Sequence, residues 1–127
     1  MNRTEINTKK APEALGPYSQ AIRIGDLIFT SGQIPIDPIT NTLVSGGIVE
    51  QATQSLRNLQ AVLTEAGSSL SDAVKVTVFV KNMDDFAKLN EVYGSFFTEP
   101  YPARSCVEVA RLPKDVLVEI EIVALAK

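Results

Sequence analysis

Histidine is absent from the 127 residues of this chain, and cysteine occurs only once. The chain therefore lacks the side chain that most often acts as a general base or as a metal ligand. One cysteine cannot form an internal disulfide, and without histidine it cannot build a zinc-type cluster. The same absence excludes Ser-His-Asp and Cys-His catalysis. Any proton transfer in this protein must use carboxylates, lysine, tyrosine, cysteine or water.

Long apolar stretches and an excess of positive charge are missing as well. No stretch approaches the ~18 apolar residues that span a bilayer, and residues 1–10 lack the apolar centre of a secretory signal. The net charge of −3 offers no basic surface for nucleic acid. The single cysteine fits a reducing compartment. We therefore expect a cytoplasmic protein that has neither a membrane nor a nucleic acid as its partner.

The rest of the composition is that of a globular protein. Hydrophobic residues make up 45% of the chain and charged residues 21%, which leaves enough apolar side chains for a core. A chain of this length normally forms one domain, so we expect residues 1–127 to fold as a single unit. A domain of this size removes about two-thirds of its unfolded surface from water.

The hydrophobic pattern predicts an α+β protein. Apolar residues three and four apart indicate a helix that ends at Gly67, and alternating valines indicate a strand soon after it. Two further strands follow the second helix, and we expect them to be neighbours in the sheet. After a short first strand and a loop over 6–14, the expected elements are a hairpin over 20–24 and 27–33, a connection over 35–47, a helix over 48–66, a strand over 73–81, a helix over about 82–97, and strands near 102–113 and 118–123.

The alternation of side chains predicts which residues share a sheet face. Two helices cannot cover both faces of the sheet, so we place both on the face of Val74, Val76, Val78 and Val80, together with Val107 and Val109. The other face also carries apolar side chains, and oligomerisation is the simplest way to cover them. The polar and aromatic residues expected on this second face are Lys75, Thr77, Phe79, Arg104, Cys106, Glu108, Glu119 and Glu121.

Arg104 is the first candidate for a ligand-binding residue. A guanidinium is always charged and holds a carboxylate through two hydrogen bonds, which suits a small carboxylated ligand. Glu119 stands between Val118 and Ile120 on a strand of low polarity, where partial burial would raise its pKa and suit it for acid–base chemistry. The alternative is that Arg104 only forms a cross-strand ion pair with Glu119 or Glu108, and that Glu119 is simply solvated.

Five other residues are candidates for the lining of such a site, and each has a plainer interpretation. Cys106 lies two residues after Arg104, so a pocket wall or ordinary burial suits it better than the role of nucleophile. Tyr18 follows a Gly-Pro turn and either contacts a ligand or packs. Ser31 and Gly32 end a strand, where glycine permits close approach or marks a bulge. Asn90 is a polar residue on an apolar helix.

Six short blocks occur in a fixed order: Gly16-Pro17-Tyr18-Ser19-Gln20-Ala21, Ser31-Gly32-Gln33-Ile34-Pro35, Thr77-Val78-Phe79-Val80, Asp85-Phe86-Ala87-Lys88-Leu89-Asn90-Glu91-Val92-Tyr93, Pro102-Ala103-Arg104-Ser105 and Val118-Glu119-Ile120-Glu121. Together they resemble the RidA/YjgF family of reactive-intermediate (enamine/imine) deaminases. The resemblance extends from about residue 14 to the end of the chain. The Pro-Ala-Arg-Ser block with the following Glu-Ile-Glu strand is its specific part, since no single block alone would suffice.

The resemblance implies a chorismate-mutase-like α+β subunit, whose mixed sheet carries two helices on one face, and a homotrimer with clefts between subunits. It implies hydrolysis of 2-imino acids, such as 2-iminobutyrate or 2-iminopropionate from dehydratases, to 2-keto acids and ammonia. Arg104 would hold the substrate carboxylate, and Glu119 would position or activate the attacking water. No metal and no organic cofactor are implied. The residues that would line the pocket are Tyr18, Ser31, Gly32, Asn90 and Cys106.

The chain departs from the family pattern at two places. Pro38-Ile39-Thr40-Asn41 stands where the family usually has Pro-x-Thr-Gly, and because asparagine also tolerates left-handed backbone we expect the turn to persist. The segment 98–101 is shorter than the pattern leads us to expect. It precedes the Pro-Ala-Arg block and is expected near the rim of the cleft, where it would affect the preferred size of the substrate.

Two other functions remain open beside imine deamination. A non-catalytic sensor of small carboxylates would use the same Arg104 clamp to bind a 2-keto acid without turnover. An RNA-acting or chaperone-like protein is a role known among relatives, but acidic charge and missing histidine disfavour nuclease chemistry. Deamination is favoured because a protonated imine is already electrophilic, so holding it beside an ordered water is mostly a proximity effect.

Overall fold

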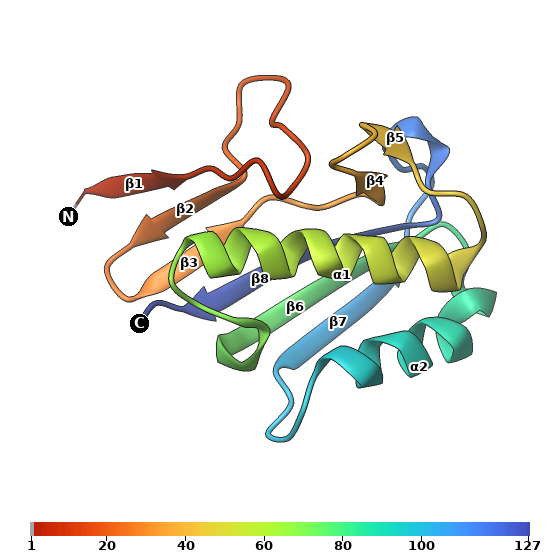
Figure 1. The fold of residues 1–127 in the computed structure, drawn as a ribbon. Helices are drawn as coiled ribbons and strands as arrows, with labels where there is room; N and C mark the ends of the chain where they lie inside the picture. The colour runs from red at the N-terminus through yellow and green to blue at the C-terminus, as the bar shows by residue number, and fades with distance from the viewer. Residues whose placement is uncertain (1) are drawn as a thin grey trace.

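The computed structural model describes residues 2–127. They form an α+β fold, in which two α-helices cover one face of a β-sheet (Figure 1). This confirms the predicted fold class and the predicted order of the main elements. The strands and helices are β1 (Arg3–Ile6), β2 (Ala21–Ile24), β3 (Leu27–Thr30), β4 (Ile36–Asp37), β5 (Thr42–Leu43), α1 (Ile48–Glu65), β6 (Ala73–Val80), α2 (Phe86–Phe96), β7 (Ala103–Glu108) and β8 (Val118–Leu125).

The large sheet is mixed, with the strand order β1-β2-β3-β8-β6-β7. Strands β6 and β7 are parallel and are joined through α2, whereas the other neighbours are antiparallel. A parallel pair needs such a crossover connection, and here the helix of that connection covers β7. Both α1 and α2 lie in front of the sheet in Figure 1, as predicted. The two-stranded β4–β5 hairpin occupies part of the long connection between β3 and α1.

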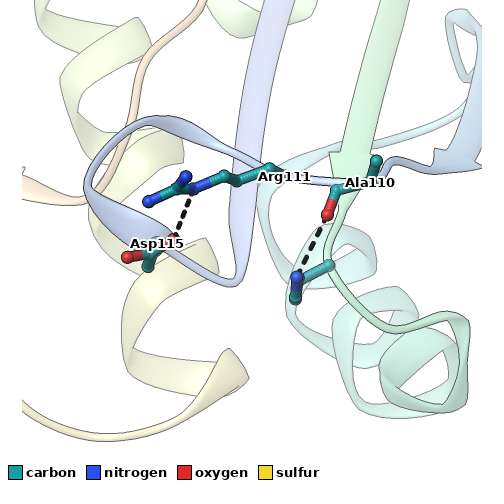
Figure 2. A network of polar contacts seen from close by, with 4 residues as sticks. Ala110, Arg111 and Asp115 are labelled. Atoms are coloured by element: carbon teal, nitrogen blue, oxygen red, sulfur yellow. Dashed lines mark hydrogen bonds and ion pairs between the residues drawn. The ribbon is translucent and has the colours of Figure 1, made fainter.

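The prediction that the two C-terminal strands are neighbours is wrong, because β6 lies between β7 and β8. The connection passes the end of β6, where the Lys81 amide donates to the Leu117 carbonyl at 3.0 Å. Figure 2 shows this connection, with Arg111 paired to Asp115 at 3.0 Å and the Ala110 carbonyl accepting a hydrogen bond. A short loop favours a hairpin, but here it contains the 3-10 turn η3 (Pro113–Asp115) and spans one strand.

Helix α1 follows the predicted period and supplies much of the core. Leu56, Leu59, Val62 and Leu63 are fully buried at spacings of three and four residues. Gly67 follows the helix at φ 77°, and the Ser68 amide donates to the Leu63 carbonyl at 2.8 Å. This is the Schellman arrangement, which a glycine permits without strain.

The covered face of the sheet differs from the predicted face in strands β6 and β7. Val76, Val78 and Val80 are buried as expected, but a register shift near Ala73 leaves Val74 exposed. In β7, Arg104 pairs with Val76 and Cys106 with Val78, so both lie on the helix-covered face. The expectation that they share a face with Glu119 is therefore wrong. The opposite face of the sheet, which points away from the helices and is called the open face, carries Thr77, Phe79, Val107, Glu119 and Glu121.

The physical reason for this error is that alternation defines two sides of a strand but not which side faces the core. Glu108 is also on the covered side of β7, and Val107 points to the open face, where it stays half-exposed. On the covered side, Arg104 of β7 meets α2, where Asn90 Oδ1 accepts its hydrogen bond at 2.7 Å. A pattern within β7 alone carries no information about that contact.

Candidate functional site

Arg104 lies beneath α2 and is held by that helix. Its Nη1 atom donates to Asn90 Oδ1 at 2.7 Å, and its guanidinium carbon lies over the rings of Tyr93 and Phe86. Within residues 2–127 no Asp or Glu forms an ion pair with Arg104. The alternative of a cross-strand pair with Glu119 or Glu108 is therefore wrong for a single chain. The Glu108 carboxylate instead accepts from the Met83 amide at 2.9 Å.

A pocket opens in front of this guanidinium. Its volume of about 460 Å³ is ample for a small organic acid. Cys106 does not line this pocket, although it lies on the same face of β7, two residues after Arg104. The lining residues come from α2 and from the segment that enters β7, and they are Asn90, Tyr93, Gly94, Tyr101, Pro102 and Arg104.

Cys106 is partly buried against the core. Burial raises the pKa of its thiol, and the smaller opposing effect of Arg104 does not reverse this. The thiol is therefore held in its neutral form, which is a poor nucleophile. A neutral thiol fits the expectation that Cys106 does not attack a substrate, but in one chain Cys106 does not line the Arg104 pocket as expected.

Glu119 lies on the opposite, open face of the sheet, in β8. Burial raises the pKa of its carboxyl, and the neighbouring charge of Glu121 raises it further. Gly32 makes room for this side chain, because a Cβ atom at that position would overlap the Glu119 carboxylate. The Gln33 amide holds the segment in place by donating to the Ile120 carbonyl at 2.8 Å. A close approach of the backbone to the Glu119 side chain thus explains this glycine.

Ser31 and Tyr18 belong to the chain segments around β2 and β3. The Ser31 hydroxyl donates to the Ser19 carbonyl at 2.6 Å, which ties the end of β3 to the loop that carries Tyr18. The buried Gln20 amide anchors the same loop, accepting from the Thr8 amide at 2.7 Å and donating to the Pro12 carbonyl at 2.7 Å. Tyr18 itself is 53% exposed and is available to a ligand or to another copy.

The candidate residues therefore form two groups in one chain. Arg104, Asn90 and Cys106 belong to the covered side beneath α2, whereas Glu119 and Gly32 lie together on the open side. One chain does not bring Arg104 and Glu119 together, because they project from opposite faces of the same sheet. In the part of the chain that the structure describes, no three acidic, cysteine or histidine side chains are grouped to hold a metal ion.

A comparison with protein-family models shows the family to which the chain belongs. The family described as Endoribonuclease L-PSP matches residues 8–126. The chain belongs to this family, which is the YjgF/RidA family. The six sequence blocks that resembled it are thereby explained, and the fold agrees with that of solved members.

Relatives within the YjgF/RidA family are similar along nearly the whole chain. A RutC family protein of Pyrococcus abyssi is 56% identical over 124 residues, which cover 98% of each chain. The 2-iminobutanoate/2-iminopropanoate deaminase of Salmonella typhimurium is 52% identical over 130 residues, covering all of both chains. A crystal structure of Escherichia coli TdcF with bound serine is 46% identical, with a TM-score of 0.92 and coverage of 98% and 99%.

The structure shows how Asn41 fits at the position where the family pattern usually has glycine. This residue adopts φ 59°, the left-handed conformation that the usual glycine would take, and its amide donates to the Asp37 carbonyl at 2.8 Å. The turn therefore persists, as expected from the tolerance of asparagine for this conformation. No helix of residues 2–127 combines the length and the apolar character needed to cross a bilayer.

Sequence reasoning missed three residues beside Arg104. The sequence alone gives Tyr93 and Phe86 only as apolar residues of the second helix, and it indicates no role for Tyr101. The signal that could have found two of them is the spacing of Phe86, Asn90 and Tyr93, which places one polar and two aromatic residues on a single helix stripe.

Proposed function

We propose that this chain is a hydrolase that converts small 2-imino acids, such as 2-iminobutyrate and 2-iminopropionate, to 2-keto acids and ammonia. The observation that carries the proposal is the Arg104 guanidinium, which lines a pocket of about 460 Å³ and has no carboxylate partner within residues 2–127. Relatives 52% identical over the full length bear the deaminase name, which supports this activity. The serine bound to TdcF is a small molecule with a carboxylate.

Arg104 binds the substrate carboxylate in this proposal. Asn90 occupies one edge of the guanidinium through Nη1, so other N–H donors stay free for a ligand. Charge-assisted hydrogen bonds of this kind contribute roughly 1.5–3 kcal/mol each. The carboxylate clamp thereby fixes the C=N carbon at one place relative to the rest of the site.

Glu119 handles the protons of the reaction. Its carboxylate accepts a proton from water while the water oxygen bonds to the carbon of the protonated imine, which gives a carbinolamine. Glu119 then returns this proton to the nitrogen, and the carbon–nitrogen bond breaks as the carbonyl forms. The hydroxyl proton leaves with ammonia as ammonium. The raised pKa of Glu119 brings it closer to neutral pH, where a general base that must also return its proton is most effective.

A second copy of the chain is needed to complete this site. Arg104 and Glu119 lie on opposite faces of one sheet, so the base that acts on a substrate at Arg104 must come from a neighbouring copy. Contacts between two different patches form a ring when the rotation from one copy to the next closes, and a trimer is the smallest ring in which every copy uses both patches at different neighbours. The half-exposed Phe29, Val107 and Leu125 on the open face support such a contact.

The test is the rate of 2-iminobutyrate hydrolysis. The imine is generated in the assay from threonine by a dehydratase, and semicarbazide traps what remains, so hydrolysis lowers the rate of semicarbazone formation. Wild type is expected to accelerate hydrolysis, and Arg104→Ala and Glu119→Gln are expected to lose that effect. Arg111→Ala is the matched control, because this arginine is exposed and, among residues 2–127, forms an ion pair only with Asp115 in the β7–β8 connection.

A non-catalytic carboxylate-binding protein is the second candidate, and one observation favours it. The groups that hold the Arg104 guanidinium, Asn90, Tyr93 and Phe86, come from its own chain, so a carboxylate can bind there without Glu119. This function predicts that wild type binds 2-ketobutyrate in a calorimeter, that Arg104→Ala does not, and that neither protein changes the rate of imine hydrolysis. Turnover by wild type rules it out.

A further inference from the structure

The surroundings of Arg104 have a feature that carboxylate binding alone does not explain: every holder of the guanidinium is electrically neutral. Its guanidinium carbon lies 4.6 Å from the ring centroid of Tyr93 and 5.4 Å from that of Phe86. The hydrogen-bond partner is the Asn90 amide oxygen, at 2.7 Å. Aromatic faces attract a cation through their quadrupole without cancelling its charge.

These three holders lie on one stripe of α2. Phe86, Asn90 and Tyr93 are spaced by four and three residues, so their side chains point to the same side of the helix. Tyr93 is only 5% exposed and stacks on Phe97, with ring centroids 4.5 Å apart, which fixes the ring that faces Arg104. Packing on both sides therefore fixes the Tyr93 ring, which is the buried member of this stripe.

We propose that Tyr93 and Phe86 are positioning residues that, together with Asn90, hold the Arg104 guanidinium without neutralising it, so that its full charge is available to the substrate carboxylate. This inference rests on the proposed function only for the identity of the ligand. A glutamate or aspartate in place of these holders would orient the guanidinium equally well, but it would compete with the substrate for the same donors.

The Tyr93 hydroxyl gives the proposal a matched pair of variants. This atom is buried and has no hydrogen-bond partner among residues 2–127. Burial raises the pKa of the phenol despite the opposing effect of Arg104, so the ring stays neutral beside the cation. Because the hydroxyl bonds to nothing there, Tyr93→Phe keeps the holding face and removes only an unpaired polar atom.

The experiment measures 2-ketobutyrate binding by calorimetry and, for the imine, KM and kcat separately. Tyr93→Leu preserves apolar volume but removes the aromatic face, and we expect Kd and KM to rise about 2- to 30-fold with kcat nearly unchanged. Tyr93→Phe is expected to bind like wild type. Phe86→Leu should have a smaller effect than Tyr93→Leu because its ring lies farther from the guanidinium. Phe96→Leu is the control, since this ring does not contact Arg104.

Asn90→Asp tests the electrical argument directly, since it keeps the size of the side chain and adds a negative charge. We expect it to weaken 2-ketobutyrate binding at pH 7 more than Asn90→Ala does, because the new carboxylate pairs with Arg104. Equal or tighter binding by Asn90→Asp would overturn the proposal. So would a Tyr93→Leu variant that is folded and binds like wild type.

The failure of this proposal is distinguishable from failure of the proposed function. If wild type binds 2-ketobutyrate but does not hydrolyse the imine, the deaminase function is wrong while the variants still test the holder. A ligand-free readout is the NMR resonance of the Arg104 Nε–H group, which the nearby rings should shift. That shift is expected to persist in Tyr93→Phe and to diminish in Tyr93→Leu, and its persistence in Tyr93→Leu would contradict the proposal.

Discussion

The two faces of the sheet differ in how the surroundings of a charged residue affect its ionised form. Beneath α2, neutral groups of the same chain contact Arg104, and no carboxylate within residues 2–127 pairs with its charge. On the open face, burial and the charge of Glu121 disfavour the ionised form of Glu119. A cation that keeps its charge and a carboxyl that readily takes up a proton are suited to different tasks. Under the proposed function, one chain would therefore contain two incomplete sites, a binding half around Arg104 and an acid–base half around Glu119.

Mixing two inactive variants should produce the largest effect. Arg104→Ala lacks the binding half and Glu119→Gln lacks the acid–base half, so each alone should lose about 100-fold or more in rate. When equal amounts are denatured and refolded together, about a quarter of the sites should combine an intact Arg104 with an intact Glu119 from a neighbour. The initial rate of imine hydrolysis measures this recovery.

The control for mixing is the same pair of variants refolded separately and then combined, which should stay inactive while subunits do not exchange. Mass spectrometry of tagged chains verifies exchange in the refolded sample. Absence of recovery in verified mixed assemblies would mean that both residues act within one chain, and would contradict the division into two halves.

A charged side chain on the open face should prevent formation of the proposed trimer and so keep Arg104 of one copy away from Glu119 of its neighbour. Phe29 lies on β3 and is 43% exposed, so Phe29→Lys costs a single chain little but places a charge in the proposed contact. We expect a shift from trimer to monomer in light scattering at micromolar concentration, with a loss of turnover of about 10- to 100-fold. Ile39→Lys, at a residue 92% exposed, is the control and should leave assembly intact. A trimeric, active Phe29→Lys protein would refute this contact.

A methyl group at Gly32 should affect the acid–base half alone. The added Cβ would overlap the Glu119 carboxylate, which can move aside because it ends a flexible side chain. We therefore expect Gly32→Ala to lower kcat about tenfold through misplacement of the base, with little change in Tm or in 2-ketobutyrate affinity. Gly47→Ala is the control, because a Cβ there meets no atom within 4 Å. An unchanged kcat would show that Gly32 does not determine the position of the Glu119 carboxylate.

The smallest effect concerns stability and pH. The pKa of Glu119 is raised in the folded chain, so ionisation of this residue opposes folding at every pH above that pKa. Glu119→Gln removes the penalty, and its Tm should slightly exceed that of wild type at pH 8. The difference should shrink as the pH falls through the folded pKa and vanish below the unfolded value of about 4.3. Thermal melts from pH 3.5 to 8 measure it; a difference that grows on acidification would have the wrong sign.

Much of the fold could be predicted because its signals are local. The period of α1 and the glycine that ends it concern residues a few positions apart, and the hairpin of β2 and β3 is specified by the turn at Gly25 and Asp26. The candidates Arg104 and Glu119 could be selected in the same way, from the chemistry of a guanidinium and of a carboxylate between apolar neighbours. Their roles stay predictions that the assays above test.

The placement of those candidates could not be predicted. Alternation along the strand predicts the wrong face for Arg104 and Cys106, and the apolar spacing of α2 does not distinguish Phe86 and Tyr93 from ordinary core residues. The spacing within β7 is compatible with either orientation, because the energy of an alternating strand depends on what covers each side. The partner that covers β7 is α2, and the neighbour in the sheet is β6, so neither contact is visible in the β7 sequence itself.

The sequence by itself determined which elements form and which side chains have the chemistry to hold a carboxylate or to move a proton, because propensity, capping and ionisation are properties of residues and their near neighbours. Only the tertiary structure decided that β6 separates β7 from β8 and that Arg104 and Glu119 project from opposite faces. Those features arise from packing between segments far apart in the chain, where the burial of whole faces outweighs any local preference.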